Sequence, residues 1–144
     1  MRRIGITALL MLFCIGSISA QEQEGRFAAA GLSEEEVEFF FIIFREAVAA
    51  SDKRKVATLV EYPIKVTLAS GARRTIRNRA EFIRAYDRIF HAAFRKLITK
   101  TEASDLWAKS AGVATPRGEV WFSGIGPEDR YKIRIIALNG PMRE

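Results

Sequence analysis

The sequence is poor in the residues that carry most covalent and metal chemistry. Its 144 residues include one cysteine, Cys14, and one histidine, His91. A single cysteine excludes an intramolecular disulfide. One cysteine and one histidine are also too few to supply the usual ligands of a zinc site. No glycine-rich phosphate loop is present either, because the glycines between residues 112 and 126 sit at expected turns rather than before a helix. The sequence therefore predicts no cofactor and no metal site.

The N-terminus, MRRIGITALLMLFCIGSISA, has the three parts of a secretory signal peptide: two arginines, an apolar stretch over residues 4–15, and small residues up to Ala20. The apolar stretch is shorter than the roughly 20 residues that a membrane-spanning helix needs. An uncleaved anchor is the alternative, and lipid attachment at Cys14 is disfavoured because the bulky Phe13 precedes it. We expect cleavage after Ala20 and export by the general secretory route, to the periplasm or the cell exterior, with no integral membrane segment in the mature chain.

The mature chain suits a single domain, expected over residues 33–140 after a flexible leader at 21–32. Removing residues 1–20 takes away two of the 23 basic residues and none of the 17 acidic ones, so the formal charge falls from +6 to +4. This excess favours weak attraction to anionic surfaces such as lipid headgroups or cell-wall polymers. Export makes nucleic acid an unexpected partner.

The first helix is predicted to begin at the sequence SEEEVEFFFIIFREAVAA. Ser33 and Glu36 form a capping box, and the residues that follow are apolar almost all round. Such a helix is expected to be buried on most sides; a buried strand is the alternative for FFFIIF. A short second helix is predicted after Ser51 or Asp52, either of which can cap it.

A third helix is predicted from Asn78, with Glu81 as its box partner. At about 100° per residue, Arg84, Arg88 and Arg95 fall on one side, within about 40° of each other. Phe82, Tyr86 and Phe90 fall on the opposite side, so this is an amphipathic core helix if no break occurs near His91. The arginines then form a solvated face, or a surface that docks an acidic partner, and His91 lies among them as a surface residue.

The remaining segments alternate as strands do. Residues 64–68 are predicted to form a strand that pairs with RRTI after the turn at Ser70-Gly71, and DLWA and GV are short candidates. GEVWFSGI and YKIRIIAL are expected to form a hairpin. Helices that precede an antiparallel sheet indicate an α+β fold.

Three segments in this order, FREAVAASDKRKVATLVEYPIKV, TIRNRAEFIRAYDRIF and GEVWFSGI, resemble small exported bacterial proteins of the nuclear transport factor 2-like (cystatin-like) superfamily. The resemblance covers residues 34–138. It implies a curved antiparallel sheet wrapped around the long N-terminal helix, with two further helices, forming a cone with a pocket at its open end. Members include enzymes, toxin-immunity proteins and assembly modules, so the fold does not fix the function. Members often dimerise through the sheet, which implies a homodimer.

Some members of this superfamily carry out acid–base chemistry in the cone with an aspartate and tyrosines. In this chain Asp87 and Tyr86 are the weak catalytic candidates, although a packed phenol and a surface ion pair explain them equally well. Trp107, Trp121 and Tyr62 are candidate ligand-binding residues, because Trp121 alternates out of phase with its neighbours and can face a pocket. The alternative is that both tryptophans are ordinary core residues.

Two functions follow from these residues. The first is an exported, non-catalytic binding or interaction domain that docks an unknown protein partner or envelope component, with Arg84, Arg88 and Arg95 as its partner or anion surface. The alternative is a small lyase, isomerase or hydrolase that uses Asp87 and Tyr86.

Overall fold

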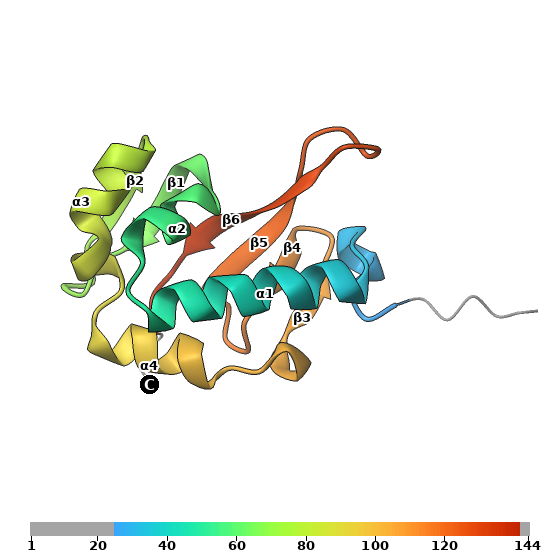
Figure 1. Cartoon of the computed structure of the whole chain (residues 1–144), viewed down its shortest axis with the longest axis horizontal. Helices are drawn as coiled ribbons and strands as arrows, with labels where there is room; N and C mark the ends of the chain where they lie inside the picture. Colours follow the sequence, from blue (N-terminus) through green and yellow to red (C-terminus); the bar gives the residue numbers. More distant parts are fainter. Residues whose placement is uncertain (1–24, 142–144) are drawn as a thin grey trace, which may run out of the picture.

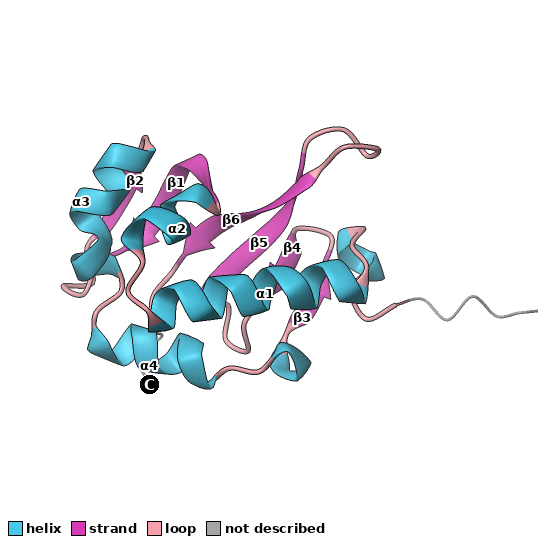
Figure 2. Cartoon of the chain, in the orientation of Figure 1, coloured by secondary structure: helices cyan, strands magenta, loops and turns pink. Residues whose placement is uncertain are grey.

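The computed structural model describes residues 25–141, so the predicted signal peptide and residues 21–24 of the leader lie outside it. The fold is α+β, as predicted. Figure 2 shows its helices, which are α1 (Glu34–Ala49), α2 (Lys53–Thr58), α3 (Arg79–Ile89) and α4 (Ala92–Lys100), with short 3₁₀ helices η1 (Ala28–Ala30) and η2 (Ala103–Asp105). The strands are β1 (Val60–Thr67), β2 (Arg73–Ile76), β3 (Trp107–Lys109), β4 (Gly112–Ala114), β5 (Val120–Ile125) and β6 (Lys132–Leu138). Within residues 25–141, no helix is long and apolar enough to cross a membrane.

The six strands form one curved sheet in the order β2-β1-β6-β5-β4-β3, and α1 crosses one of its faces (Figure 1). Four neighbouring pairs are antiparallel, but β1 and β6 are parallel. The predicted purely antiparallel sheet is therefore wrong. The predicted hairpins β1–β2 and β5–β6 both form, and the sheet becomes mixed because the last strand of the chain joins them by pairing with β1.

Helix α1 begins as predicted, with a reciprocal capping box between Ser33 and Glu36. Phe40 and Phe41 place their rings 5.1 and 6.4 Å from the ring of Phe122 on β5, so this side of α1 fills the inner face of the sheet. The opposite side stays open to solvent, where Phe39 is 66% exposed and Ile42 is 41% exposed. The expectation that α1 is buried on most sides is wrong, because the sheet and α4 cover only part of its circumference.

We predict that Phe41→Ala lowers the free energy of unfolding by about 3–5 kcal/mol, because it empties a fully buried site between α1 and the sheet. Phe39→Ala is the matched control: the same truncation on the exposed side should change stability by no more than about 0.5 kcal/mol. Urea unfolding followed by circular dichroism measures both. Equal losses for the two variants would show that the outer side of α1 is covered in solution.

The predicted third helix is divided into α3 and α4 at Phe90 and His91. The carbonyl of Arg88 accepts a hydrogen bond from the backbone N–H of Ala69, and this bond from the β1–β2 turn lies at the end of α3. Phe90 leaves helical geometry and stacks on Phe94 of α4 with ring centroids 5.5 Å apart. The assumption of one unbroken helix fails here, so α4 follows its own axis and its side chains do not continue the faces of α3.

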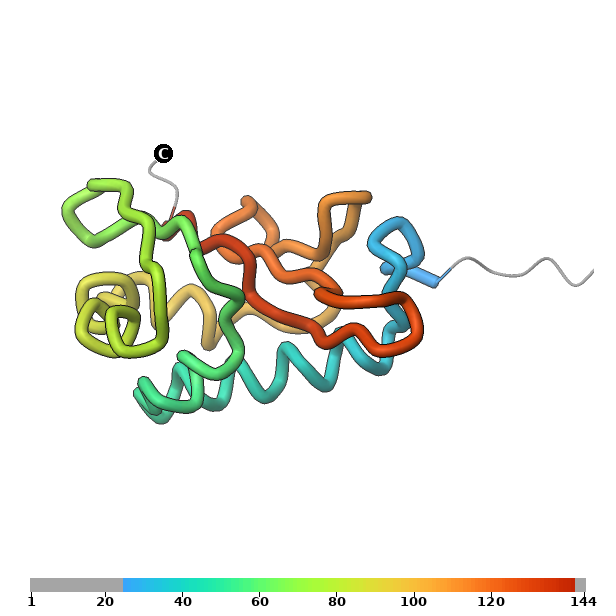
Figure 3. Tube along the Cα trace, turned by 90° about the horizontal axis from the view of Figure 1, so that it is seen from above, coloured from blue at the N-terminus to red at the C-terminus, as the bar shows by residue number. Residues whose placement is uncertain are grey.

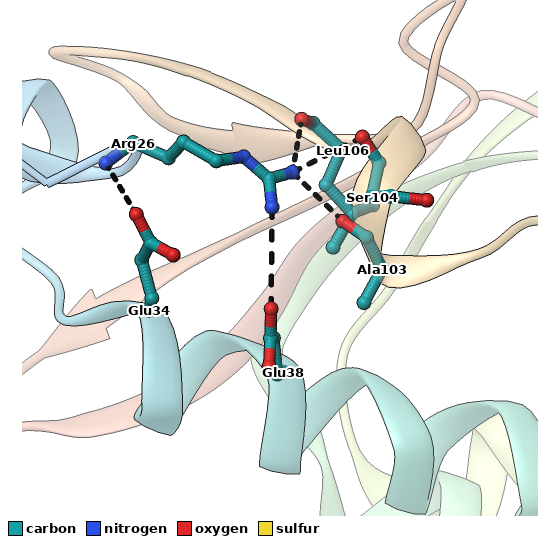
Figure 4. Close-up of polar contacts among 6 residues, drawn as sticks. All are labelled: Arg26, Glu34, Glu38, Ala103, Ser104 and Leu106. Atoms are coloured by element: carbon teal, nitrogen blue, oxygen red, sulfur yellow. Dashed lines mark hydrogen bonds and ion pairs between the residues drawn. The ribbon is translucent and has the colours of Figure 1, made fainter.

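The segment before α1 is part of the folded domain. Phe27 and Leu32 are buried in the core, although the sequence placed residues 21–32 in a flexible leader. Figure 4 shows how Arg26 holds this segment: its guanidinium donates to the carbonyls of Ala103, Ser104 and Leu106 at 2.9–3.2 Å. The prediction failed because these contacts are made to η2 and its end, about 80 residues further along the chain.

The β5–β6 hairpin is tied to the first turn of α1 through Tyr131 and Glu36. The Glu36 carboxylate accepts hydrogen bonds of 2.7 Å from the Tyr131 hydroxyl and 2.7 Å from the Ser33 hydroxyl. These bonds, of which the one from Tyr131 has the largest effect, hold the pKa of Glu36 below its ordinary value of 4.5. The same bond raises the pKa of Tyr131 above its ordinary value of 10.0.

Because the folded pKa of Glu36 is lowered, its contribution to stability is present above pH 4.5 and is lost as the pH falls through the folded pKa. We predict that Tyr131→Phe makes the free energy of unfolding fall less steeply between about pH 5 and pH 3. Urea unfolding at a series of pH values tests this. Glu128→Gln, an exposed change in the same hairpin, is the control, and an unaltered slope in Tyr131→Phe would contradict the assignment.

Candidate functional site

The two candidate catalytic residues, Tyr86 and Asp87, do not face a common space. Tyr86 is fully buried and stacks on Phe90 with ring centroids 4.8 Å apart. Burial, as the main cause, raises the pKa of Tyr86 to about 12, so the phenol stays protonated at neutral pH. Asp87 points outward, 75% exposed, with its Oδ2 2.5 Å from Nζ of Lys53. Because consecutive residues of a helix point about 100° apart, Tyr86 and Asp87 lie on different sides of α3.

The Tyr86 hydroxyl is buried and has no hydrogen-bond partner among residues 25–141. We therefore predict that Tyr86→Phe leaves the free energy of unfolding unchanged or raises it, because the change removes an unpaired buried polar group. Asp87→Asn is the companion variant and should cost at most about 1 kcal/mol, the usual limit for an exposed ion pair. Equilibrium unfolding in urea gives both values. A loss of more than about 2 kcal/mol in Tyr86→Phe would show that the hydroxyl has a partner in solution.

The two tryptophans lie together on the face of the sheet that α1 does not cover, which we call the outer face. Trp121 lies out of phase with the buried Val120 and Phe122, as the sequence alternation predicts. The indoles of Trp107 and Trp121 are 5.2 Å apart and at 83° to each other. Trp107 is 37% exposed, and its Nε1 donates to the carbonyl of Thr115 at 2.9 Å. The interpretation of both as core residues is wrong, because Trp107 is exposed and Trp121 is half-buried on the outer face.

Tyr62 lies in a different environment from the tryptophans. Its hydroxyl donates to the carbonyl of Ala57 at 2.9 Å, and burial, opposed by the charge of Arg79, raises its pKa to about 12. It lines a depression of about 430 Å³, which we call the Tyr62 depression. The other lining residues come from α2, β1, β6 and the start of α3, and they are Thr58, Val60, Glu61, Arg77, Asn78, Arg79 and Arg134. Three guanidinium groups therefore surround a space that contains one carboxylate.

A second basic feature lies over β1 and β2. Two depressions of about 400 and 540 Å³ share Thr67, Arg73 and Asn139, and together we call them the hairpin groove. Lys65 and Arg74 line its first part, and His91 lines the second. In the part of the chain that the structure describes, no carboxylate side chain lines this groove. Sequence reasoning missed this groove, because its lining residues are separated by up to 76 positions, from Lys65 to Pro141, and only the fold brings them together. The alternation of Lys65 and Thr67 with the apolar Ile64, Val66 and Leu68 was the available signal.

The predicted arginine surface is only partly present. Arg84 and Arg88 are exposed on α3. Arg95 belongs to α4 and turns inward, where its Nη1 donates to Ser51 Oγ at 2.7 Å. The three-arginine face is therefore wrong as a single surface, and the break between α3 and α4 is the reason. His91, expected among these arginines, is half-buried and lies at the N-cap position that precedes α4.

The basic side chains that line the depressions form no salt bridge with the described residues. The salt bridges among residues 25–141 involve Arg26, Arg45, Lys53 and Arg130, and none involves a cation of the Tyr62 depression or the hairpin groove. The same residues contain no group of three histidine, cysteine or acidic side chains able to hold a metal ion. The candidate site is thus a set of cations without salt-bridge partners among these residues, on a sheet that also carries two tryptophans.

No family model matches the chain, and searches of curated proteins and of solved structures give no significant match.

Proposed function

We propose that this protein is an exported, non-catalytic binding domain that recognises anionic groups on a protein partner or envelope component. The observation that carries the proposal is the lining of these depressions: among the described residues, six lysine and arginine side chains line them, and Glu61 is the single carboxylate. Such clustering of one charge sign in concave surfaces raises the local concentration of oppositely charged ligands. The long first helix packed on a curved sheet supports placing the chain in the nuclear transport factor 2-like superfamily.

The geometry supports binding better than the alternative of acid–base catalysis. A general base and an oxyanion donor must both reach one substrate. Tyr86 is enclosed by aromatic rings, whereas Asp87 lies in solvent beside Lys53. The inner side of the sheet, where a cone pocket would lie, is occupied by Phe40, Phe41 and Phe122.

The Tyr62 depression suits a carboxylate or phosphate group of the ligand. Arg77 immediately precedes α3, Arg79 is its first residue and Arg134 lies on β6. Guanidinium groups bind such oxyanions through paired N–H donors. Arg134 also donates to the carbonyl of Thr58 at 3.0 Å, which fixes its side chain at the edge of the depression. Arg77 and Arg79 are exposed and can turn toward a ligand.

We predict that the chain from residue 21, used as bait in an envelope extract, retains a specific component, and that Arg77→Gln/Arg79→Gln retains at least about tenfold less of it. Arg84→Gln/Arg88→Gln removes the same charge from α3 and is the matched control. Retention is measured by mass spectrometry at low and high salt. Equal retention by both double variants would contradict the proposal, because it would make net charge alone the cause.

A further inference from the structure

Strand registers place one row of side chains across the whole outer face. Lys65 pairs with Thr75 on one side and with Ala137 on the other. Ala137 pairs in turn with Trp121, Trp121 with Ala114, and Ala114 with Trp107. Partners in register share a face, so these six residues form a continuous row over all six strands, about 24 Å long at the usual strand spacing.

A β-bulge brings the aromatic and basic parts of the row into line. The register between β5 and β6 shifts at Trp121 and Phe122, so that Ala137 lies opposite Trp121 and Ile135 opposite Phe122. Without the shift, Ala137 would lie on the same side as Ile135, as strict alternation predicts. The bulge therefore turns Ala137 outward and leaves a small side chain between Lys65 and Trp121, two strand spacings or about 10 Å apart.

The basic end of the row widens into the hairpin groove. Thr67 pairs with Arg73, so both lie on the same face as Lys65, and Asn139 lines the groove beside them. The groove thus presents cations next to hydroxyl and amide groups. The cations can bind anions, and the hydroxyl and amide groups can form hydrogen bonds with hydroxyl groups of a ligand.

The aromatic end also carries a cation. Lys109 lies on the outer face of β3, with its Nζ 5.0 Å from the ring centre of Trp121 and 5.6 Å from that of Trp107. The two indoles are nearly perpendicular, and Ala114, between them in the row, is fully buried. This end therefore offers apolar ring surface and positive charge together.

We propose that the outer face binds an acidic polysaccharide, with its anionic groups in the hairpin groove and the apolar faces of its sugar rings on Trp107 and Trp121. The inference rests on the proposed function and names its ligand class. A chain of hydroxyl-rich rings with one anionic group on many of them matches both ends of the row at once. Thr67, Thr75 and Asn139 then bond to sugar hydroxyls between the charged contacts.

Two other occupants fit the surface less well. Single-stranded nucleic acid also combines stacking and negative charge, but successive bases stack best on aromatic rings presented as parallel platforms, whereas these indoles are at 83°. A second copy of the chain would bring Lys65, Arg73 and Lys109 against the same cations of its partner, and this repulsion opposes a dimer through the outer face.

The test measures binding of defined oligosaccharides to protein purified after expression of the full-length sequence. The probes are a galacturonate hexamer, a heparin hexasaccharide, the neutral maltohexaose and a thymidine oligonucleotide. Calorimetry gives the affinity, and tryptophan fluorescence reports contact with the indoles. We expect the two acidic oligosaccharides to bind with a change in fluorescence, and maltohexaose to bind at least about tenfold more weakly.

Matched variants separate the two ends of the row. Lys65→Gln/Arg73→Gln and Trp121→Leu should each weaken binding of the acidic oligosaccharides at least about tenfold, whereas Arg84→Gln/Arg88→Gln should change it less than about twofold. Thermal unfolding confirms that each variant is folded. We therefore expect the affinity for acidic oligosaccharides to fall when either end of the row is changed, and to stay nearly constant when α3 is changed.

Several results would overturn the inference. Binding of neither acidic probe, equal binding of maltohexaose, or no effect of Trp121→Leu would each exclude an acidic polysaccharide on this row. Tighter binding of the oligonucleotide with the same variant pattern would replace the ligand class by nucleic acid. Envelope capture that depends on Arg77 and Arg79 would still support the proposed function in any of these cases, so the two failures are distinguishable.

Discussion

The packing of aromatic rings between α1 and the rest of the chain holds this structure together. Phe41 contacts Phe122 of the sheet and Phe44 of its own helix, and Phe44 in turn contacts Phe90 at the end of α3. Phe90 stacks on Phe94 of α4. One continuous series of rings therefore joins the sheet, α1, α3 and α4. Because these rings fill the inner face of the sheet, the proposed binding site lies on the outer face and in the depressions at its edge.

The break at Phe90 follows from the same packing. In an unbroken helix, Phe90 and Phe94 would continue along one axis; at the break they stack almost in parallel, with 8° between their planes. The helix interruption lets Phe90 contact Phe44 while Phe90 and Phe94 are both buried in the core. It also moves Arg95 away from Arg84 and Arg88 and leaves His91 beside the hairpin groove. Core packing thus determines which basic side chains share a surface.

The features that sequence reasoning predicted are local. The caps at Ser33, Asp52 and Asn78 each depend on residues three positions apart, and all three form. Strand alternation also placed Trp121 correctly opposite to Phe122. What could not be predicted depends on contacts between distant segments: the parallel pairing of β1 with β6, the bulge beside Trp121, the helix break, and the burial of Phe27. The candidate site shows the same division. Tyr62, Trp107 and Trp121 could be named from the sequence as candidates for ligand binding, but the side chains that surround them in space could not be predicted.

Alternation within the strands links the fold to the proposed site. In β1, Ile64 and Val66 face the core while Lys65 and Thr67 face outward, and in β5, Phe122 packs on α1 while Trp121 joins the outer row. Outer residues can therefore change in chemistry without altering the aromatic packing on the other face. Their spacing cannot change, because the hydrogen-bonded strands fix it at about 4.8 Å. A ligand of the outer face must match that spacing, which favours an extended chain of repeating units over a compact molecule.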